Sequence, residues 1–151
     1  MTSYVPFGQF LVNAGRIDAA QLASALMLQK ELGGRLGESL VSLGLISESQ
    51  LFTELARKHG VRYVLLGDYR VDPAVVRLVP ERLARSRKVF PIAQFSDQGR
   101  STLLVATSAP QDLALLDEVA FAAGMRVKGA LASDRDIELA IDRHFGPALA
   151  P

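Results

Sequence analysis

The sequence predicts an α+β protein, in which N-terminal tandem αα-hairpins, four short helices in all, pack on a small three- to four-stranded sheet with its own helices. Two observations indicate this class. Residues 6–58 repeat a helical pattern, and after Gly60 the apolar spacing changes to short β-rich runs. A chain of 151 residues with 49% hydrophobic residues is long enough for one domain or two small lobes.

A tandem repeat occupies the first part of the chain. Residues 6–29 and 35–58 align without a gap, and their first residues, Pro6 and Arg35, are 29 positions apart. Ordinary composition would give about one or two identities over such a length. The alignment has eight: Gly8/Gly37, Leu11/Leu40, Val12/Val41, Gly15/Gly44, Ile17/Ile46, Gln21/Gln50, Leu22/Leu51 and Leu26/Leu55. A duplicated unit is therefore predicted.

Each copy of the repeat predicts a helix, a tight turn and a second helix. Pro6 suits the first helical position, where its missing N–H is not needed. Glycines are expected to end the helices, and a capping box is expected to start the second helix of each copy. These signals are Gly15, Gly33, Gly34, Gly44 and Gly60, with boxes at Asp18–Gln21 and Ser47–Gln50. We therefore expect a tandem-repeat helical subdomain over residues 1–60.

Residues 61–146 predict a small α/β subdomain, followed by a flexible tail at 147–151. Short apolar runs rich in β-branched residues predict strands at 63–66, 89–95, 102–107 and 127–132. The second and third of these runs are joined across Asp97-Gln98-Gly99-Arg100, a credible hairpin turn.

Proline and capping residues mark the helix starts of this second subdomain. Helices are expected from Asp72-Pro73, from Pro80, from Ser108-Ala-Pro110 to about Ala123, and from 137 to about 145 behind a cap at Ser133. In the helix that ends near Ala123, the apolar spacing places four residues inward, namely Leu113, Leu116, Val119 and Ala120.

Composition excludes several classes of function. A net charge of +1 disfavours DNA or RNA as the obvious partner, and the absence of cysteine excludes disulfides and thiolate metal sites. His59 and His144 lack acidic partners at metal spacing, so we expect neither a metal nor a cofactor. No apolar run is long enough to insert in a membrane and no secretory signal is evident, so we expect a soluble cytoplasmic protein.

A group of basic residues follows the middle of the chain: Arg77, Arg82, Arg85, Arg87 and Lys88. Such a group is most often a solvated helix face, and the alternative is a docking surface for an acidic partner. No carboxylate pair or nucleophile motif stands out, so we expect no enzymatic activity.

The paired pattern [RK]LGxxLxxxGxIxxxxLxxxLxxQ resembles the N-terminal MshEN-type domain of type II secretion and type IV pilus assembly ATPases, the GspE N-terminal domain family. Four later stretches are also similar to that domain: 63–68, 79–81, 90–92 and 109–112. The chain has no GxxxxGK[ST] phosphate loop, so the resemblance implies a stand-alone copy without the ATPase.

The resemblance implies that cyclic di-GMP binds across the two motifs. Helix N-termini and arginine favour phosphates, a guanidinium can stack on a purine, and leucines offer an apolar bed for the bases. The candidate ligand-binding residues are Gly8, Leu11, Leu26 and Gln29 from the first motif, and Arg35, Leu36, Gly37, Leu40, Leu55 and Lys58 from the second.

Two departures from the family pattern leave alternatives open. The first motif has Pro6-Phe7 in place of a basic residue and leucine, and the second ends in Lys58 in place of glutamine. Each lost contact would remove on the order of 1–3 kcal/mol. The sequence is therefore compatible with a cyclic di-GMP receptor, or with an adaptor that has a degenerate site and docks a secretion or pilus assembly protein or ATPase at the inner membrane. An enzyme is the third reading.

Overall fold

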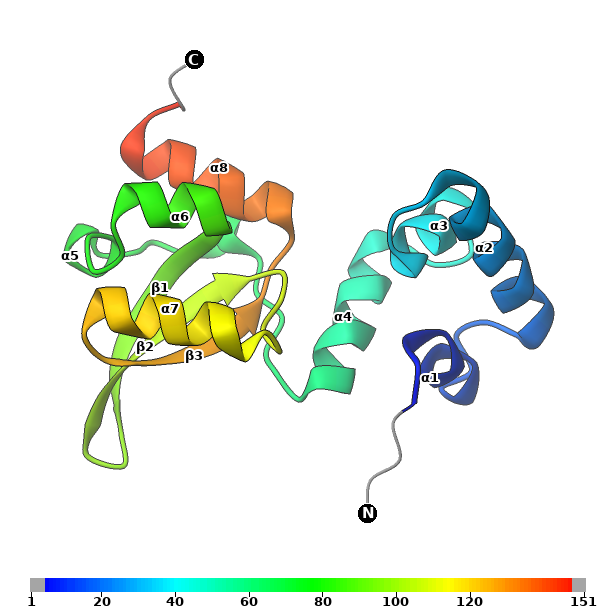
Figure 1. The fold of residues 1–151 in the computed structure, drawn as a ribbon, viewed down its shortest axis with the longest axis horizontal. Helices are drawn as coiled ribbons and strands as arrows, with labels where there is room; N and C mark the ends of the chain where they lie inside the picture. Colours follow the sequence, from blue (N-terminus) through cyan, green and yellow to red (C-terminus); the bar gives the residue numbers. More distant parts are fainter. Residues whose placement is uncertain (1–4, 148–151) are drawn as a thin grey trace. The chain divides into compact units, whose positions relative to one another are not determined.

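The computed structural model describes residues 5–147 and has two compact units, Met1–Gly60 and Val61–Pro151, which we call the repeat unit and the sheet unit (Figure 1). The repeat unit is helical and the sheet unit combines a small mixed sheet with helices, so the predicted α+β class is confirmed. Within residues 5–147, no helix combines the length and the apolar character that crossing a membrane requires. Beyond Pro147, the predicted tail lies outside the described residues.

The repeat unit contains the four predicted helices. They are α1 (Phe7–Asn13), α2 (Ala19–Leu32), α3 (Leu36–Ser42) and α4 (Glu48–His59). The first helices of the two copies, α1 and α3, each have seven residues and similar C-terminal geometry. The duplication seen in the sequence is therefore also a duplication of backbone structure.

Capping boxes begin the second helix of each copy, as predicted. Asp18 accepts a 2.7 Å hydrogen bond from the backbone N–H of Gln21, whose side chain accepts one from the N–H of Asp18 at 2.9 Å. Ser47 and Gln50 form the same pair of bonds at 3.1 and 3.0 Å. Pro6 differs slightly from the expectation, because it lies at the N-cap of α1 and not at its first helical residue.

The core of the repeat unit is built from equivalent residues of the two copies. Leu11 and Leu40 are fully buried. Gly8 and Gly37 are buried because a neighbouring leucine occupies the space of a side chain. A Cβ on Gly8 would lie 2.5 Å from Leu22 Cδ1, and a Cβ on Gly37 would lie 2.8 Å from Leu51 Cδ1. These glycines therefore allow the helices of each hairpin to approach closely.

The sheet unit contains a three-stranded sheet in residues 61–147, with the order β1 (Val89–Asp97), β2 (Arg100–Thr107), β3 (Arg126–Leu131). Strands β1 and β2 pair in antiparallel orientation and β2 and β3 in parallel. Gln98 and Gly99 turn the hairpin with φ of 52° and 77°, the left-handed region that a two-residue turn of this kind requires. The predicted hairpin is confirmed.

Helices cover the sheet and bury its core. They are α5 (Pro73–Val76), α6 (Glu81–Arg87), α7 (Leu113–Ala123) and α8 (Asp134–Phe145). In Figure 1, α6 and α8 lie side by side, α8 contacts β1 and β2, and α7 packs on β3. Because α7 connects β2 to the parallel β3, this part of the chain is a βαβ unit.

The strand predicted at 63–66 is wrong. Only an isolated parallel bridge from Tyr63 to Leu131 forms there, with Val64 N–H donating to the Leu131 carbonyl at 2.9 Å. Directly afterwards the chain turns through a 3₁₀ helix, Leu66–Asp68. Val64 and Leu66 of the run are buried on the core through this turn, whereas Leu65 is half exposed and no ladder continues the bridge along residues 63–66.

The predicted start of α7 is also wrong. Asp112, and not Ser108-Ala-Pro110, caps the helix, because its carboxylate accepts a 3.1 Å hydrogen bond from the N–H of Leu115. The residues that face the core also differ in part from the prediction. Leu115 and Val119 are buried, whereas Leu113, predicted to point inward, is 72% exposed.

Candidate functional site

The structure divides the ten candidate binding residues by accessibility. Four are buried in the repeat unit: Gly8, Leu11, Gly37 and Leu40. Six have accessible or partly accessible side chains: Leu26, Gln29, Arg35, Leu36, Leu55 and Lys58. The buried four shape the unit, so only the other six offer side-chain surface that a ligand could contact.

The starts of α1 and α3, which are the first helices of the two motifs, lie against each other. A Cβ on Gly8, near the start of α1, would be 3.0 Å from Cδ2 of Leu36, the first residue of α3. The two copies therefore place their equivalent ends together. Leu26 is 46% exposed on α2 and lies outside the buried core of the unit, so it offers apolar surface to the solvent.

Gln29 and Arg35 flank the turn that joins the two copies. The amide Nε2 of Gln29 donates a 3.0 Å hydrogen bond to the carbonyl of Gly34. Arg35 is the N-cap of α3, is exposed, and makes no capping hydrogen bond with its side chain. A positive charge at the N-terminus of a helix is unfavourable, because the helix dipole is positive there. The guanidinium of Arg35 therefore does not stabilise α3 as a cap and remains exposed.

The last turn of α4 is basic, with Arg57, Lys58 and His59. Burial lowers the pKa of His59, and the positive charge of Lys58 lowers it further. His59 is therefore mostly neutral at neutral pH, and the fixed positive charges here are those of Arg57 and Lys58.

A buried ion-pair cluster lies beside these residues, and the sequence analysis missed it. The side chain of Glu54 is only 3% exposed. One of its oxygens accepts a 2.9 Å hydrogen bond from Nε of Arg16, and the other accepts bonds from Nε and Nη2 of Arg57 at 3.1 and 2.9 Å. The only sequence signal was that Ala25 of the first copy is replaced by Glu54 at a position facing the core.

The electrostatics of this cluster favour an ionised carboxylate. Burial alone would raise the pKa of Glu54, but hydrogen bonds and charge attraction from Arg57 and Arg16 outweigh it and hold this pKa below its usual value. Two guanidinium groups against one carboxylate leave the cluster with a net positive charge.

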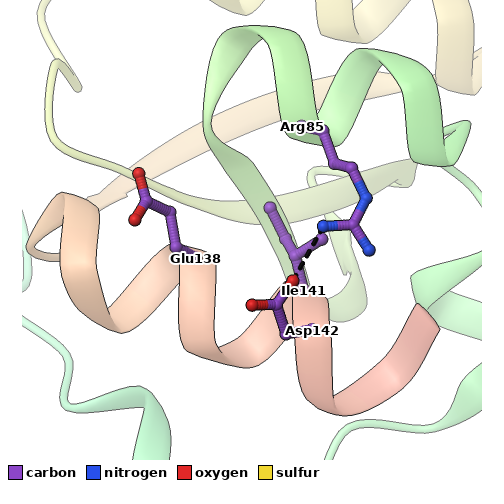
Figure 2. A pocket seen from close by; sticks show the side chains of 4 residues that line it. All are labelled: Arg85, Glu138, Ile141 and Asp142. Atoms are coloured by element: carbon purple, nitrogen blue, oxygen red, sulfur yellow. Dashed lines mark hydrogen bonds and ion pairs between the residues drawn. The ribbon is translucent and has the colours of Figure 1, made fainter. Parts of the chain in front are cut away.

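Two basic residues of α6, Arg85 and Arg87, are paired within the sheet unit, whereas Arg82 of the same helix is exposed. Arg85 contacts Glu81 at 2.9 Å and Asp142 at 2.8 Å, and it also donates to the carbonyl of Gly146. Figure 2 shows this arginine reaching from α6 to Asp142 on α8, at the edge of a cavity of about 250 Å³.

Two further ion pairs neutralise this region. Arg87 pairs with Glu118 at 3.4 Å, and Lys88 pairs with Glu138, which also lines the cavity, at 3.1 Å. The ion pairs of Arg85 and Lys88 thus join the α6 region to α8, so these two side chains are engaged within the chain and are less available to an acidic partner. Across residues 5–147, no group of three or more metal-ligating side chains is suited to a metal ion.

A family model described as the MshEN domain matches residues 59–151. The chain belongs to the MshEN domain family. The matched residues cover the sheet unit and the end of α4, whereas the tandem motifs that carry the resemblance in the sequence lie before them. The pairwise relatives extend the similarity over both units of this MshEN protein.

The type IV pilus assembly ATPase PilB of Myxococcus xanthus is 32% identical over 145 residues, which are 94% of this chain and 25% of that protein. The chain therefore spans about a quarter of the length of this relative. A solved structure described as MshE with cdg (cyclic di-GMP) is 32% identical, with a TM-score of 0.81, and covers 93% of this chain and 99% of that one.

The N-terminal domain of XpsE is a more distant structural neighbour. It has 21% identity and a TM-score of 0.64, and it covers 95% of this chain and 98% of that one. This likeness supports the MshEN fold alone.

Proposed function

We propose that this MshEN protein is a non-catalytic cyclic di-GMP receptor that regulates a type IV pilus or secretion system. The observation that carries the proposal is the likeness to MshE, whose structure is described with cyclic di-GMP, over 93% of the chain. A receptor of this kind would act in the cytoplasm, and a partner protein would recruit it to the inner membrane.

The geometry of the repeat unit supports a shared ligand site. The starts of α1 and α3 lie together, and cyclic di-GMP has two phosphates and two guanines, which suit a duplicated site. The exposed guanidinium of Arg35 can stack on a guanine or bind a phosphate, and the exposed surface of Leu26 can contact a base. Gln29 and Lys58 add polar groups at the ends of α2 and α4.

Isothermal titration with cyclic di-GMP tests the proposal. We expect binding at micromolar concentration or tighter, and a loss of about tenfold to a hundredfold in affinity for Arg35→Ala. Arg82→Ala is the matched control, because it removes the same group from an exposed position on α6 of the sheet unit. If the wild type does not bind and Pro6→Arg does, the receptor proposal is overturned, and the protein is a domain of this fold that has lost its ligand.

A second candidate is an adaptor with a degenerate nucleotide site that docks pilus or secretion assembly components. The observation that favours it is on α7, where Leu113 is 72% and Phe121 is 93% exposed. Exposed large apolar side chains are a common feature of protein interfaces. Copurification with the pilus assembly proteins of the same organism, lost in Phe121→Ser but kept in Arg35→Ala, would support the adaptor.

A further inference from the structure

The two copies of the repeat differ in charge at their first residue. Arg35 precedes α3, and the equivalent position before α1 holds Pro6. The internal repeat therefore displays a cation at the start of one motif helix and none at the start of the other. A symmetrical site would provide one arginine for each of two phosphates. In this protein, the two equivalent positions provide only one arginine.

A guanidinium from another helix lies close to this uncharged start. Cζ of Arg57, on α4, lies 5.2 Å from the centroid of the Phe10 ring, a distance suited to a cation–π contact. Phe10 is one helical turn from Pro6, since its N–H donates to the Pro6 carbonyl at 3.0 Å. The Phe10 ring also stacks on Phe7 with centroids 6.3 Å apart. Arg57 is thus held over the ring of Phe10, one turn from the start of α1.

The buried carboxylate of Glu54 fixes the orientation of Arg57. Two hydrogen bonds, from Nε and Nη2, join one edge of the guanidinium to a single oxygen of Glu54. The side chain of Arg57 is nevertheless 59% exposed, and within residues 5–147 its Nη1 group has no hydrogen-bond partner. A cation that is oriented on one edge and open to solvent on the other is prepared to bind an anion.

These contacts have no counterpart in the other half of the repeat. The positions equivalent to Arg57, Phe10 and Glu54 hold Leu28, Ser39 and Ala25. The arginine and its two supports therefore occur together, and they occur beside the copy whose first residue lacks a charge.

We propose that Arg57 is the phosphate-binding cation of the first half of the site, the counterpart of the guanidinium that Arg35 would contribute to the second. This inference rests on the proposed function and deepens it. The ligand class is a cyclic dinucleotide, whose second phosphodiester the free Nη1 edge of Arg57 contacts. Glu54 and Phe10 are positioning residues for this group.

Titration of the full chain with cyclic di-GMP tests the inference through four proteins. We expect Arg57→Ala to weaken binding about tenfold to a hundredfold relative to the wild type. Arg16→Ala is the matched control, because it removes the other ion pair of Glu54 and leaves Arg57 in place, and we expect its affinity to stay within about twofold of the wild type. The double variant Pro6→Arg/Arg57→Ala is expected to regain most of the lost affinity.

The outcomes separate the inference from the proposed function. Binding by the wild type that is unchanged in Arg57→Ala overturns the inference and leaves the receptor standing, whereas no binding by the wild type overturns both. Equal weakening by Arg57→Ala and Arg16→Ala, with equal loss of melting temperature, would show that the cluster acts on stability only. If Pro6→Arg/Arg57→Ala binds no better than Arg57→Ala, an arginine at position 6 cannot replace Arg57, and the inference that Arg57 supplies the missing cation is overturned.

Discussion

Single glycines determine how closely the helices of each hairpin approach. Because a Cβ at Gly37 would lie 2.8 and 2.9 Å from the two Cδ atoms of buried Leu51, we expect Gly37→Ala to destabilise the repeat unit by about 1–3 kcal/mol. Thermal unfolding followed by circular dichroism measures the effect. Gly67→Ala is the control, since no atom lies within 4 Å of its added Cβ, and an equal loss in both variants would contradict the packing argument.

Glu54 makes stability depend on pH at acidic values. The ion pairs lower the pKa of Glu54 in the folded state, so its stabilising contribution is present above the unfolded-state pKa near 4.5 and is lost as pH falls through the lower folded-state value. We expect the free energy of unfolding of the wild type to decrease between about pH 5 and pH 3 more steeply than that of Glu54→Gln.

Urea unfolding at several pH values measures this difference. At neutral pH, Glu54→Gln is expected to cost about 1–2 kcal/mol, because the three hydrogen bonds that the charged carboxylate accepts are weakened or lost. Glu48→Gln changes an exposed carboxylate on the same helix and serves as the control. If the free energy of unfolding depends on pH in the same way in Glu54→Gln and in the wild type, the Glu54 ion pairs do not cause the loss of stability at acidic pH.

At the scale of elements, the β1–β2 hairpin contains a residue with a left-handed backbone that a smaller residue would suit better. Gln98 has a φ of 52° in the two-residue turn. We expect Gln98→Asn to raise the stability of the sheet unit by about 0.5 kcal/mol, because asparagine adopts this region more readily. Unfolding by denaturant measures this gain in stability. The same substitution at Gln94, within β1, should stabilise nothing, and a gain there would point to another cause.

Elements with strong local signals could be predicted from the sequence. The capping boxes at Asp18 and Ser47 and the turn at Gln98-Gly99 are encoded by a few adjacent residues, so the αα-hairpins and the β1–β2 hairpin were predicted correctly. The run at 63–66 was not, because its apolar residues are equally suited to a strand and to a buried turn. Only contact with Leu131, far along the chain, decides between them.

The candidate site was predictable only in part for a similar reason. The repeat identified the motif positions, including Arg35 at the start of α3, but their accessibility depends on packing. The Glu54 cluster could not be predicted, because Arg16 is 38 residues from Glu54 and meets it only when α4 packs beside the first turn of the unit.

At the scale of the whole molecule, the two units have separate cores. Buried clusters form around Leu11 and Leu40 in the repeat unit and around Phe90 and Val105 in the sheet unit. We expect calorimetry to show two unfolding transitions, with cyclic di-GMP raising only that of the repeat unit, because a ligand stabilises the structure it binds. The Gly37→Ala variant assigns the transitions, and one transition that shifts as a whole would contradict their independence.

The matching caps and glycines of the two copies have a consequence for how such a protein can change over generations. Each copy starts its second helix with its own capping box and ends its first with its own glycine. A mutation at the surface of one copy therefore leaves the local folding signals of the other intact. Selection can act on the halves one at a time, so the two copies can come to differ, as they do at Pro6 and Arg35, without loss of either hairpin.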